Sequence, residues 1–157
     1  MEENLKPKKK VLIVDDLMQA EMLREILLGN YPNEMEVAIF SNAGDAVEWL
    51  ETNWPDVVVV ELFLLYGNAA ELLGKITDPG LQETGLRLIQ FIHKTTEIKN
   101  KSPVPTFLVT TQRSKNVNTD DSVTRIYEKP FSTLKFEDDL CKTLGIKSKI
   151  PPELLAV

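Results

Sequence analysis

Trp54-Pro55-Asp56-Val57-Val58-Val59-Val60-Glu61 is the stretch that decides the fold. Its four consecutive valines are β-branched, show no polar alternation and are too few to span a membrane. Such a run is typical of a strand inside a parallel sheet that helices cover on both faces. Ligands of open parallel sheets bind beyond the carboxyl ends of the strands. Glu61, which follows the valines, therefore stands where a functional site is expected.

Apolar segments on either side of this run alternate with segments of helical periodicity. The expected strands are 11–14, 36–40, 57–60, 106–109 and 123–128, and the expected helices are 17–28, 43–53, 85–94 and 133–144. Helices between successive strands make parallel crossovers, so the pattern predicts an α/β fold. We expect a doubly wound, five-stranded parallel sheet with helices on both faces. In the first helix, Met18 and Met22 are assigned to the core-facing stripe.

Two stretches interrupt the alternation. Residues 65–83 contain an Asp-Pro-Gly turn and are interpreted as an insertion after the third strand, either a surface loop or a lid or partner surface. Residues 112–121 are polar with almost no apolar stripe, so a fourth helix there is expected to be short or absent. The length predicts one domain, 11–145, after a polar lead-in, 1–10, and before an extended tail, 146–157.

Composition excludes several classes of protein. The net charge of -6 disfavours direct DNA binding, and the lysine-rich start is interpreted as a solvated lead-in to a buried strand. The single cysteine, Cys141, cannot form an internal disulfide and is expected to pack in the core. The first apolar run, Val11 to Val14, is too short for a signal peptide or an anchor. We therefore expect a cytoplasmic protein that contacts no membrane.

Polar side chains follow four of the expected strands: Asp15 with Asp16, then Glu61, Thr110 and Lys129. The carboxyl ends of parallel strands meet at one edge, so these groups are expected to converge. Carboxylates suit octahedral Mg²⁺, while lysine and threonine can hold phosphoryl oxygens. Taken singly the residues indicate little, because Asp15 would also suit a helix N-terminus and Lys129 a solvated surface.

Together and in this order, the segments resemble the receiver domain of two-component response regulators. The resemblance spans roughly 9–145 and is carried by 11–16, 55–61, 105–110 and 127–131. It implies the flavodoxin-like strand order 2-1-3-4-5. Gly85 matches the glycine that begins the family's third helix, although it comes later in the chain than usual.

The resemblance also implies roles for individual residues. Asp15 and Asp16 would form the acidic metal pocket, which Glu61 and the backbone carbonyl of Phe63 would complete around Mg²⁺. Thr110 would be the switch hydroxyl, and Lys129 would bind the phosphoryl group. At the place of the switch aromatic stands Ile126, with Tyr127 next to it.

Glu61 occupies the place of the family's phosphoacceptor aspartate. Its carboxylate lies one methylene further out, and in-line phosphoryl transfer is sensitive to misplacement of about 1 Å. Such a glutamate can imitate a phosphorylated aspartate, with one negative charge in place of roughly two. We therefore expect a degenerate, stand-alone receiver that is not an enzyme, binds Mg²⁺ weakly and acts through a histidine kinase, a phosphotransfer protein or a downstream effector, as a monomer or weak homodimer.

Two alternatives stay open. The protein could be a Mg²⁺-dependent phosphoacceptor of a phosphorelay, using Glu61, Asp15 or Asp16. It could instead be a flavodoxin-like enzyme or binder of a phosphorylated ligand, although no glycine-rich phosphate loop follows the first strand. His93 is interpreted as a surface or boundary histidine, because no second histidine or cysteine near it would complete a zinc site.

Overall fold

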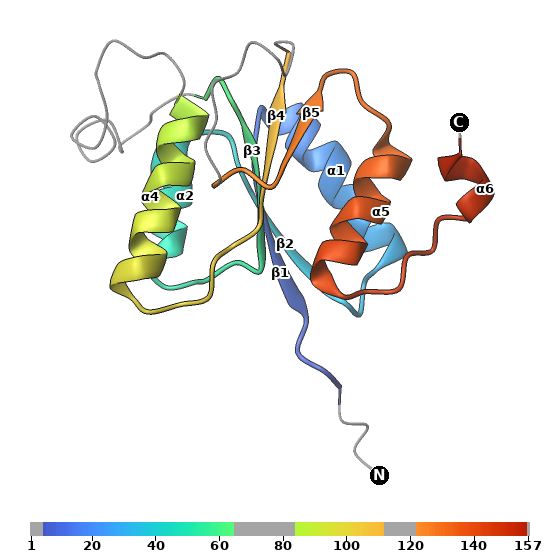
Figure 1. Cartoon of the computed structure of the whole chain (residues 1–157), viewed down its shortest axis with the longest axis horizontal. Coiled ribbons are helices and arrows are strands. Elements are labelled where there is room, and N and C mark those ends of the chain that lie inside the picture. The colour runs from blue at the N-terminus through green and yellow to red at the C-terminus, as the bar shows by residue number, and fades with distance from the viewer. Residues whose placement is uncertain (1–4, 65–83, 112–121, 157) are drawn as a thin grey trace.

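The computed structural model of the chain describes residues 5–64, 84–111 and 122–156 (Figure 1). These residues form a five-stranded sheet of order β2-β1-β3-β4-β5 in which every pairing is parallel. The α/β class and the strand order are as predicted. The elements are β1 (Lys9–Val14), α1 (Leu17–Asn30), β2 (Met35–Phe40), α2 (Ala43–Leu50), β3 (Val57–Glu61), α4 (Thr84–Ile98), β4 (Thr106–Thr110), β5 (Arg125–Glu128), α5 (Thr133–Leu144) and α6 (Pro152–Leu155).

Helices cover the sheet on both faces, α2 and α4 on one and α1 and α5 on the other (Figure 1). Successive residues of the central strand point to opposite faces. Val58 and Val60 belong to the core under α2 and α4, while Val57 and Val59 belong to the core under α1 and α5. All four valines are completely buried, which confirms the prediction made from their unbroken run.

Local capping signals define where several helices begin and end. The Asn42 side chain accepts a hydrogen bond from the Asp45 N–H at 2.9 Å and begins α2, and Ser132 accepts one from the Lys135 N–H at 3.3 Å and begins α5. Gly145 ends α5 with a φ of 69°, a left-handed conformation that glycine adopts without strain. The start of α2 and both ends of α5 agree with the helix bounds predicted from the sequence.

The prediction that two methionines of α1 face the core is wrong. Met18 is 82% exposed and Met22 is 39% exposed, whereas the buried side of α1 consists of Ala20, Leu23 and Leu27. Apolar residues lie on several sides of this helix, so periodicity alone cannot show which stripe faces the sheet. The exposed methionines lie beside the strand ends described below.

Several element boundaries also differ from the prediction. Helix α4 continues to Ile98 instead of ending near Lys94, and in its last turns the Thr95 and Thr96 hydroxyls donate to carbonyls one turn earlier. Strand β1 starts at Lys9 and β5 only at Arg125. The tail, expected to be extended throughout, contains the short helix α6, with a proline in its first turn.

The predicted insertion at 65–83 and the predicted short or absent helix at 112–121 lie outside the described residues. Cys141 is buried and free, as expected of a packing residue. In the part of the chain that the structure describes, no helix is both long and apolar enough to cross a bilayer.

Candidate functional site

The strand ends bring the predicted site residues to one edge of the sheet, the upper edge in Figure 1. Val14 pairs with Val60, so Asp15 and Glu61, the residues that follow them, leave the sheet side by side. Thr110 pairs with Glu128, which places Lys129 just beyond the end of β4. The topology therefore assembles the cluster predicted from the sequence.

The ammonium group of Lys129 lies at the centre of the cluster. Its Nζ is 2.6 Å from Glu61 Oε2 and 2.9 Å from Asp15 Oδ1. Asp16 is more distant, with Oδ2 at 3.9 Å, and its side chain is 65% exposed. Lys129 is thus held by two largely buried carboxylates, while Asp16 points to solvent.

Asp15 is the most constrained of these acids. Its Oδ1 accepts hydrogen bonds from Lys129 and from the Asp16 N–H, but its Oδ2 is buried without a partner among the described residues. Burial raises the pKa of Asp15 to about 6, although Lys129 opposes this shift. Burial alone would lower the pKa of Lys129, but hydrogen bonds to Glu61 and Asp15 outweigh it, so that pKa is raised.

The backbone around Glu61 is fixed by a close approach of α4. The Gly85 N–H donates to the Leu62 carbonyl at 2.8 Å. A Cβ on Gly85 would lie 2.1 Å from the Glu61 carbonyl oxygen, so only glycine allows α4 to begin here. The Glu61 side chain is turned back, with Oε1 accepting from the Phe63 N–H at 3.4 Å.

Thr110 is completely buried at the end of β4. Its carbonyl accepts a hydrogen bond from the Lys129 N–H at 2.7 Å, so the backbone of β4 positions the lysine. The peptide bond that follows, Lys129–Pro130, is cis. The predicted role of the Thr110 hydroxyl as a switch stays a prediction.

The acids do not form a ready cage for Mg²⁺. Within residues 5–64, 84–111 and 122–156, no group of three or more His, Cys, Asp or Glu side chains could hold a metal ion. Lys129 occupies the point toward which Asp15 and Glu61 converge, and Asp16 faces outward. Asp15 Oδ2, which has no partner in the described part of the chain, suits a cation, but the set fits Mg²⁺ only if Lys129 moves.

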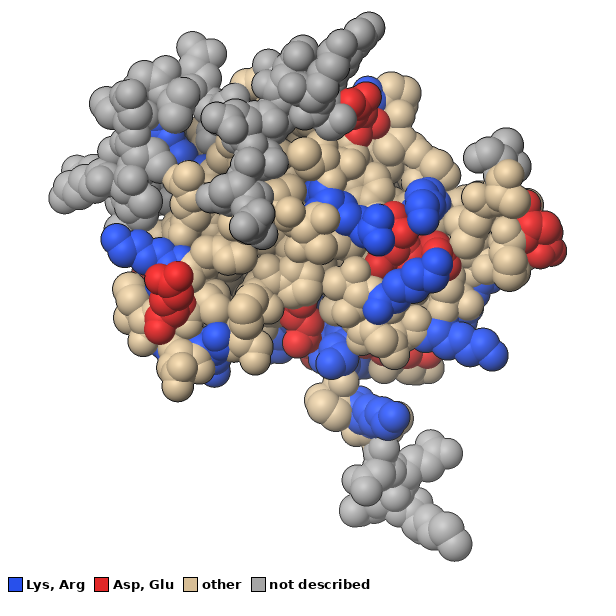
Figure 2. Space-filling view, in the orientation of Figure 1, with Lys and Arg blue, Asp and Glu red and all other residues tan. Residues whose placement is uncertain are grey.

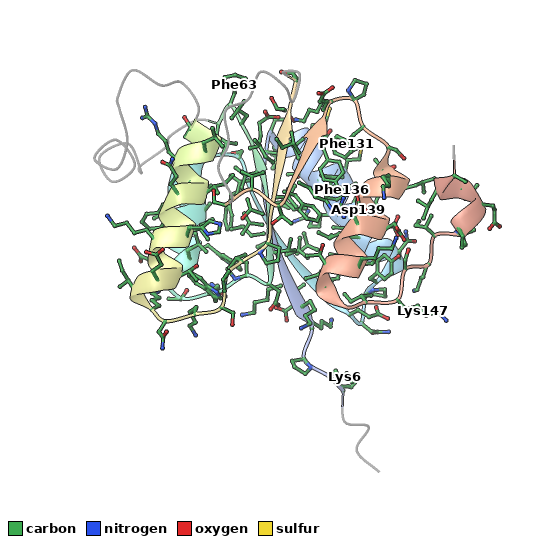
Figure 3. The ribbon with its side chains drawn as sticks, viewed as in Figure 1. Lys6, Phe63, Phe131, Phe136, Asp139 and Lys147 are labelled. Carbon is green, nitrogen blue, oxygen red and sulfur yellow. The ribbon has the colours of Figure 1, made fainter. Side chains whose placement is uncertain are left out.

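The sequence did not reveal an acid that anchors β5 to α5. Tyr127 points to the α5 face, where its hydroxyl donates to Asp139 Oδ2 at 2.6 Å and its ring packs against those of Phe131 and Phe136 (Figure 3). Asp139 also accepts from Lys135 at 2.9 Å. Burial would raise the pKa of Asp139, but the Tyr127 and Lys135 hydrogen bonds outweigh it and the pKa is lowered. Its neighbours in sequence, Glu137 and Asp138, are also acidic, so the sequence carries no local signal that Asp139 is buried.

An open cavity of about 360 Å³ adjoins the cluster. It lies between α1 and the segment that joins β5 to α5, and its lining residues are Gln19, Met22, Thr111, Lys129, Pro130, Phe131 and Thr133. Met22, which was wrongly predicted to face the core, therefore forms part of the surface beside Lys129. His93 is remote from this cavity, half-buried with Nε2 3.1 Å from the Ser122 carbonyl oxygen, as expected of a boundary histidine.

Comparison with known proteins gives a consistent result at the level of structure. No family model and no curated protein matches the sequence. A response regulator from Thermotoga maritima is similar with a TM-score of 0.63 and 17% identity over 88% of this chain and 99% of that one. A second from the same organism, TrrA in complex with Mg²⁺-BeF, has a TM-score of 0.61 and 18% identity over 86% and 98% of the chains.

The receiver domain of a sensor histidine kinase from Pseudomonas aeruginosa, with a magnesium ion coordinated in its active site cleft, has a TM-score of 0.57 and 17% identity over 88% and 99% of the chains. These structures agree with the strand order and the helix placement seen here. At such identities the likeness concerns the architecture. The chain therefore has the fold of response regulator receiver domains.

Proposed function

We propose that the protein is a receiver of the two-component type that signals through protein–protein contacts without the usual phosphorylation of an aspartate. One observation carries the proposal: the residue that ends β3 beside Lys129 is a glutamate, with its Oε2 2.6 Å from the ammonium. We infer that the protein is not an enzyme, because the site offers an ion pair in place of an activated nucleophile.

The ion pair resembles a phosphorylated site in a limited way. Lys129, which by the resemblance would bind a phosphoryl oxygen, is here bound to the Glu61 carboxylate, which reaches it through one methylene more than an aspartate has. The pair supplies one negative charge where an acyl phosphate supplies roughly two. It would hold Lys129 in one position, so the site would have a resting state that needs no phosphodonor.

We propose that Mg²⁺ binds weakly, as the magnesium in two of the similar structures suggests. Asp15, Asp16 and the Phe63 carbonyl would hold it beside Glu61, where it would neutralise carboxylate charge. Binding would require Lys129 to give up the Asp15 Oδ1 contact at 2.9 Å, which costs part of the gain. Affinity is therefore expected to be low.

The surface beside the cluster suits a partner protein. Leu17, Met18 and Met22 are 53%, 82% and 39% exposed at the start of α1, and Leu134 is 37% exposed at the start of α5. The open cavity that Met22 and Phe131 line lies between these helices. Exposed apolar side chains that gather on one surface, with polar groups at their edge, are common at protein interfaces. We propose that a histidine kinase, a phosphotransfer protein or an effector docks here.

Intact mass spectrometry after incubation with Mg²⁺ and acetyl phosphate tests the proposal. We expect the wild-type protein to keep its mass, because Glu61 is misplaced for in-line attack. The Glu61→Asp variant, which withdraws the carboxylate by one methylene, is expected to gain the mass of one phosphoryl group.

A stoichiometric adduct on the wild-type protein that disappears in Glu61→Gln would refute the proposal. That result would support the rival function, a Mg²⁺-dependent phosphoacceptor. An adduct that persists in Glu61→Gln would point to Asp15 or Asp16 as the acceptor. Thermal unfolding of Glu61→Asp verifies that the variant is folded before its reactivity is interpreted.

A further inference from the structure

A second candidate site lies at the other end of the sheet, where the chain enters β1 and leaves α5. An open groove of about 410 Å³ is lined there by residues of the arm 5–9, the turn 33–34 and the segment 144–147. Lys6 and Lys147, labelled in Figure 3, stand on two of its walls. The six residues of β1 separate this lysine groove from Asp15 by roughly 20 Å.

Backbone hydrogen bonds hold the base of the arm, at Lys9, and the segment that follows α5 in place. The Lys9 N–H donates to the Glu34 carbonyl at 2.8 Å, which ties the arm to the turn. The Ile146 N–H donates to the Cys141 carbonyl at 2.9 Å, and the Lys149 N–H donates to the Tyr31 hydroxyl at 2.9 Å. A groove whose backbone is already ordered loses less entropy when a ligand binds.

The rim of the groove is positively charged. Lys6, Lys9 and Lys147 are exposed, and none of them takes part in an ion pair with another of the described residues. Among the described residues one acid, Glu34, lines the groove, but its Oε2 is buried away from solvent. Figure 2 shows basic side chains along the arm and on the adjoining lower side of the body.

Apart from the amide of Asn33, the side chains that complete the lining are apolar. Leu5 and Pro7 come from the arm, and Leu144 and Ile146 come from the end of α5. Leu5 is 81% exposed, so its side chain is available to a ligand. An apolar lining below three unpaired ammonium groups is complementary to an apolar side chain flanked by carboxylates.

We propose that the lysine groove binds an acidic segment of a partner protein, in which carboxylates flank one apolar side chain. Three cations match a few charges, whereas the overall charge of -6 repels polyanions such as duplex DNA. A concave groove can enclose a protruding side chain. A flat bilayer surface presents no such side chain, so a peptide fits the groove better than a membrane does. The inference goes beyond the proposed function and does not depend on Glu61.

Fluorescence anisotropy with the full-length protein tests the assignment. The probe is a labelled pentapeptide of four glutamates around a central leucine, titrated at low and at physiological ionic strength. We expect saturable binding that weakens with salt, because exposed charges are screened. Replacing the central leucine by serine is expected to weaken binding several-fold, since the apolar lining then has no partner.

Charge reversal locates the binding site. The double variant Lys6→Glu and Lys147→Glu is expected to bind the probe at least tenfold more weakly. Lys8→Glu is the control for the single variant Lys6→Glu, because Lys8 is exposed on the same arm but does not line the groove and both variants reverse one charge. The dissociation constant for the peptide is expected to change by no more than about threefold in the Lys8→Glu variant, because solvent and salt screen a charge that does not contact the ligand. Glu61→Gln is expected to bind like wild type.

Several results would overturn the inference. Absence of saturable binding would exclude an acidic ligand of this kind. An equal loss in the Lys8→Glu control would show general charge attraction in place of a groove. Binding of phosphatidylglycerol vesicles or duplex DNA in preference to the peptide, with the same dependence on Lys6 and Lys147, would assign the surface to a membrane or to nucleic acid.

Discussion

Asp15 carries a buried carboxylate with one satisfied oxygen and one that has no partner among the described residues. Burial raises its pKa to about 6 from an ordinary value of 3.8. The folded state therefore binds this proton more tightly than the unfolded state does. By linkage, the contribution of Asp15 to stability is fully present below pH 3.8 and is lost as the pH rises through about 6.

The Asp15→Asn variant should remove this pH dependence. At pH 8 we expect the variant to unfold with a free energy about 1 kcal/mol higher than wild type, because it avoids burying a charge but gives up attraction to Lys129. At pH 4 the advantage should vanish. Urea denaturation at pH 4, 6 and 8 measures it.

Asp16→Asn is the control for this experiment, since the Asp16 side chain is 65% exposed. Asp16 caps α1 by accepting a hydrogen bond from the Gln19 N–H at 3.1 Å, and asparagine caps a helix equally well. Its stability should follow that of wild type within about 0.5 kcal/mol at each pH. A loss of stability in Asp15→Asn that is the same at pH 4 and pH 8 would show that the carboxylate does not titrate in this range.

At the scale of elements, α4 and β3 meet at one point that tolerates no side chain. A Cβ on Gly85 would lie 2.1 Å from the Glu61 carbonyl oxygen and 2.8 Å from the Leu62 Cα, both backbone atoms. Gly85→Ala must therefore displace α4 from β3, at an expected cost of 2 kcal/mol or more, on the order of a severe overpacking mutation. Chemical denaturation measures this cost.

Gly29 provides a matched control in α1, because no atom of the described residues lies within 4 Å of the Cβ that an alanine would add there. Gly29→Ala should leave stability unchanged or raise it by up to about 1 kcal/mol, since alanine is the better helix former. Equal stability of the two variants would mean that α4 can slide along β3 without penalty.

The sequence predicted the elements that a single pattern determines. Valines without alternation require a strand buried on both faces, and four polar strand ends indicated where Asp15, Glu61 and Lys129 would meet. It failed where two placements were equally consistent with local pattern. The apolar residues of α1 permit more than one buried stripe, so Met18 was wrongly predicted to face the core. Asp139 follows other acids in the sequence, and only its tertiary contact with Tyr127 shows that it is buried.

At the scale of the molecule, the same strands build both cores. Phe107 belongs to the core under α1 and α5, and its neighbour Leu108 belongs to the core under α2 and α4. If the helices of one face leave the sheet, they expose one side of strands whose other side forms the core under the helices of the opposite face. A single cooperative unfolding transition is the physical consequence.

Trp49 and Trp54 both pack against the α2 and α4 core, so tryptophan fluorescence reports on that layer. Phe136 is almost fully buried in the opposite core. Phe136→Leu should destabilise the protein by about 1–2 kcal/mol through imperfect repacking. Because the strands are shared, we expect the urea midpoints by tryptophan fluorescence and by far-ultraviolet circular dichroism to fall together. If the fluorescence midpoint stays at the wild-type value while the dichroism midpoint falls, the two layers unfold separately. In that case α5 would unfold beside the Lys129 cluster while β3 remains folded.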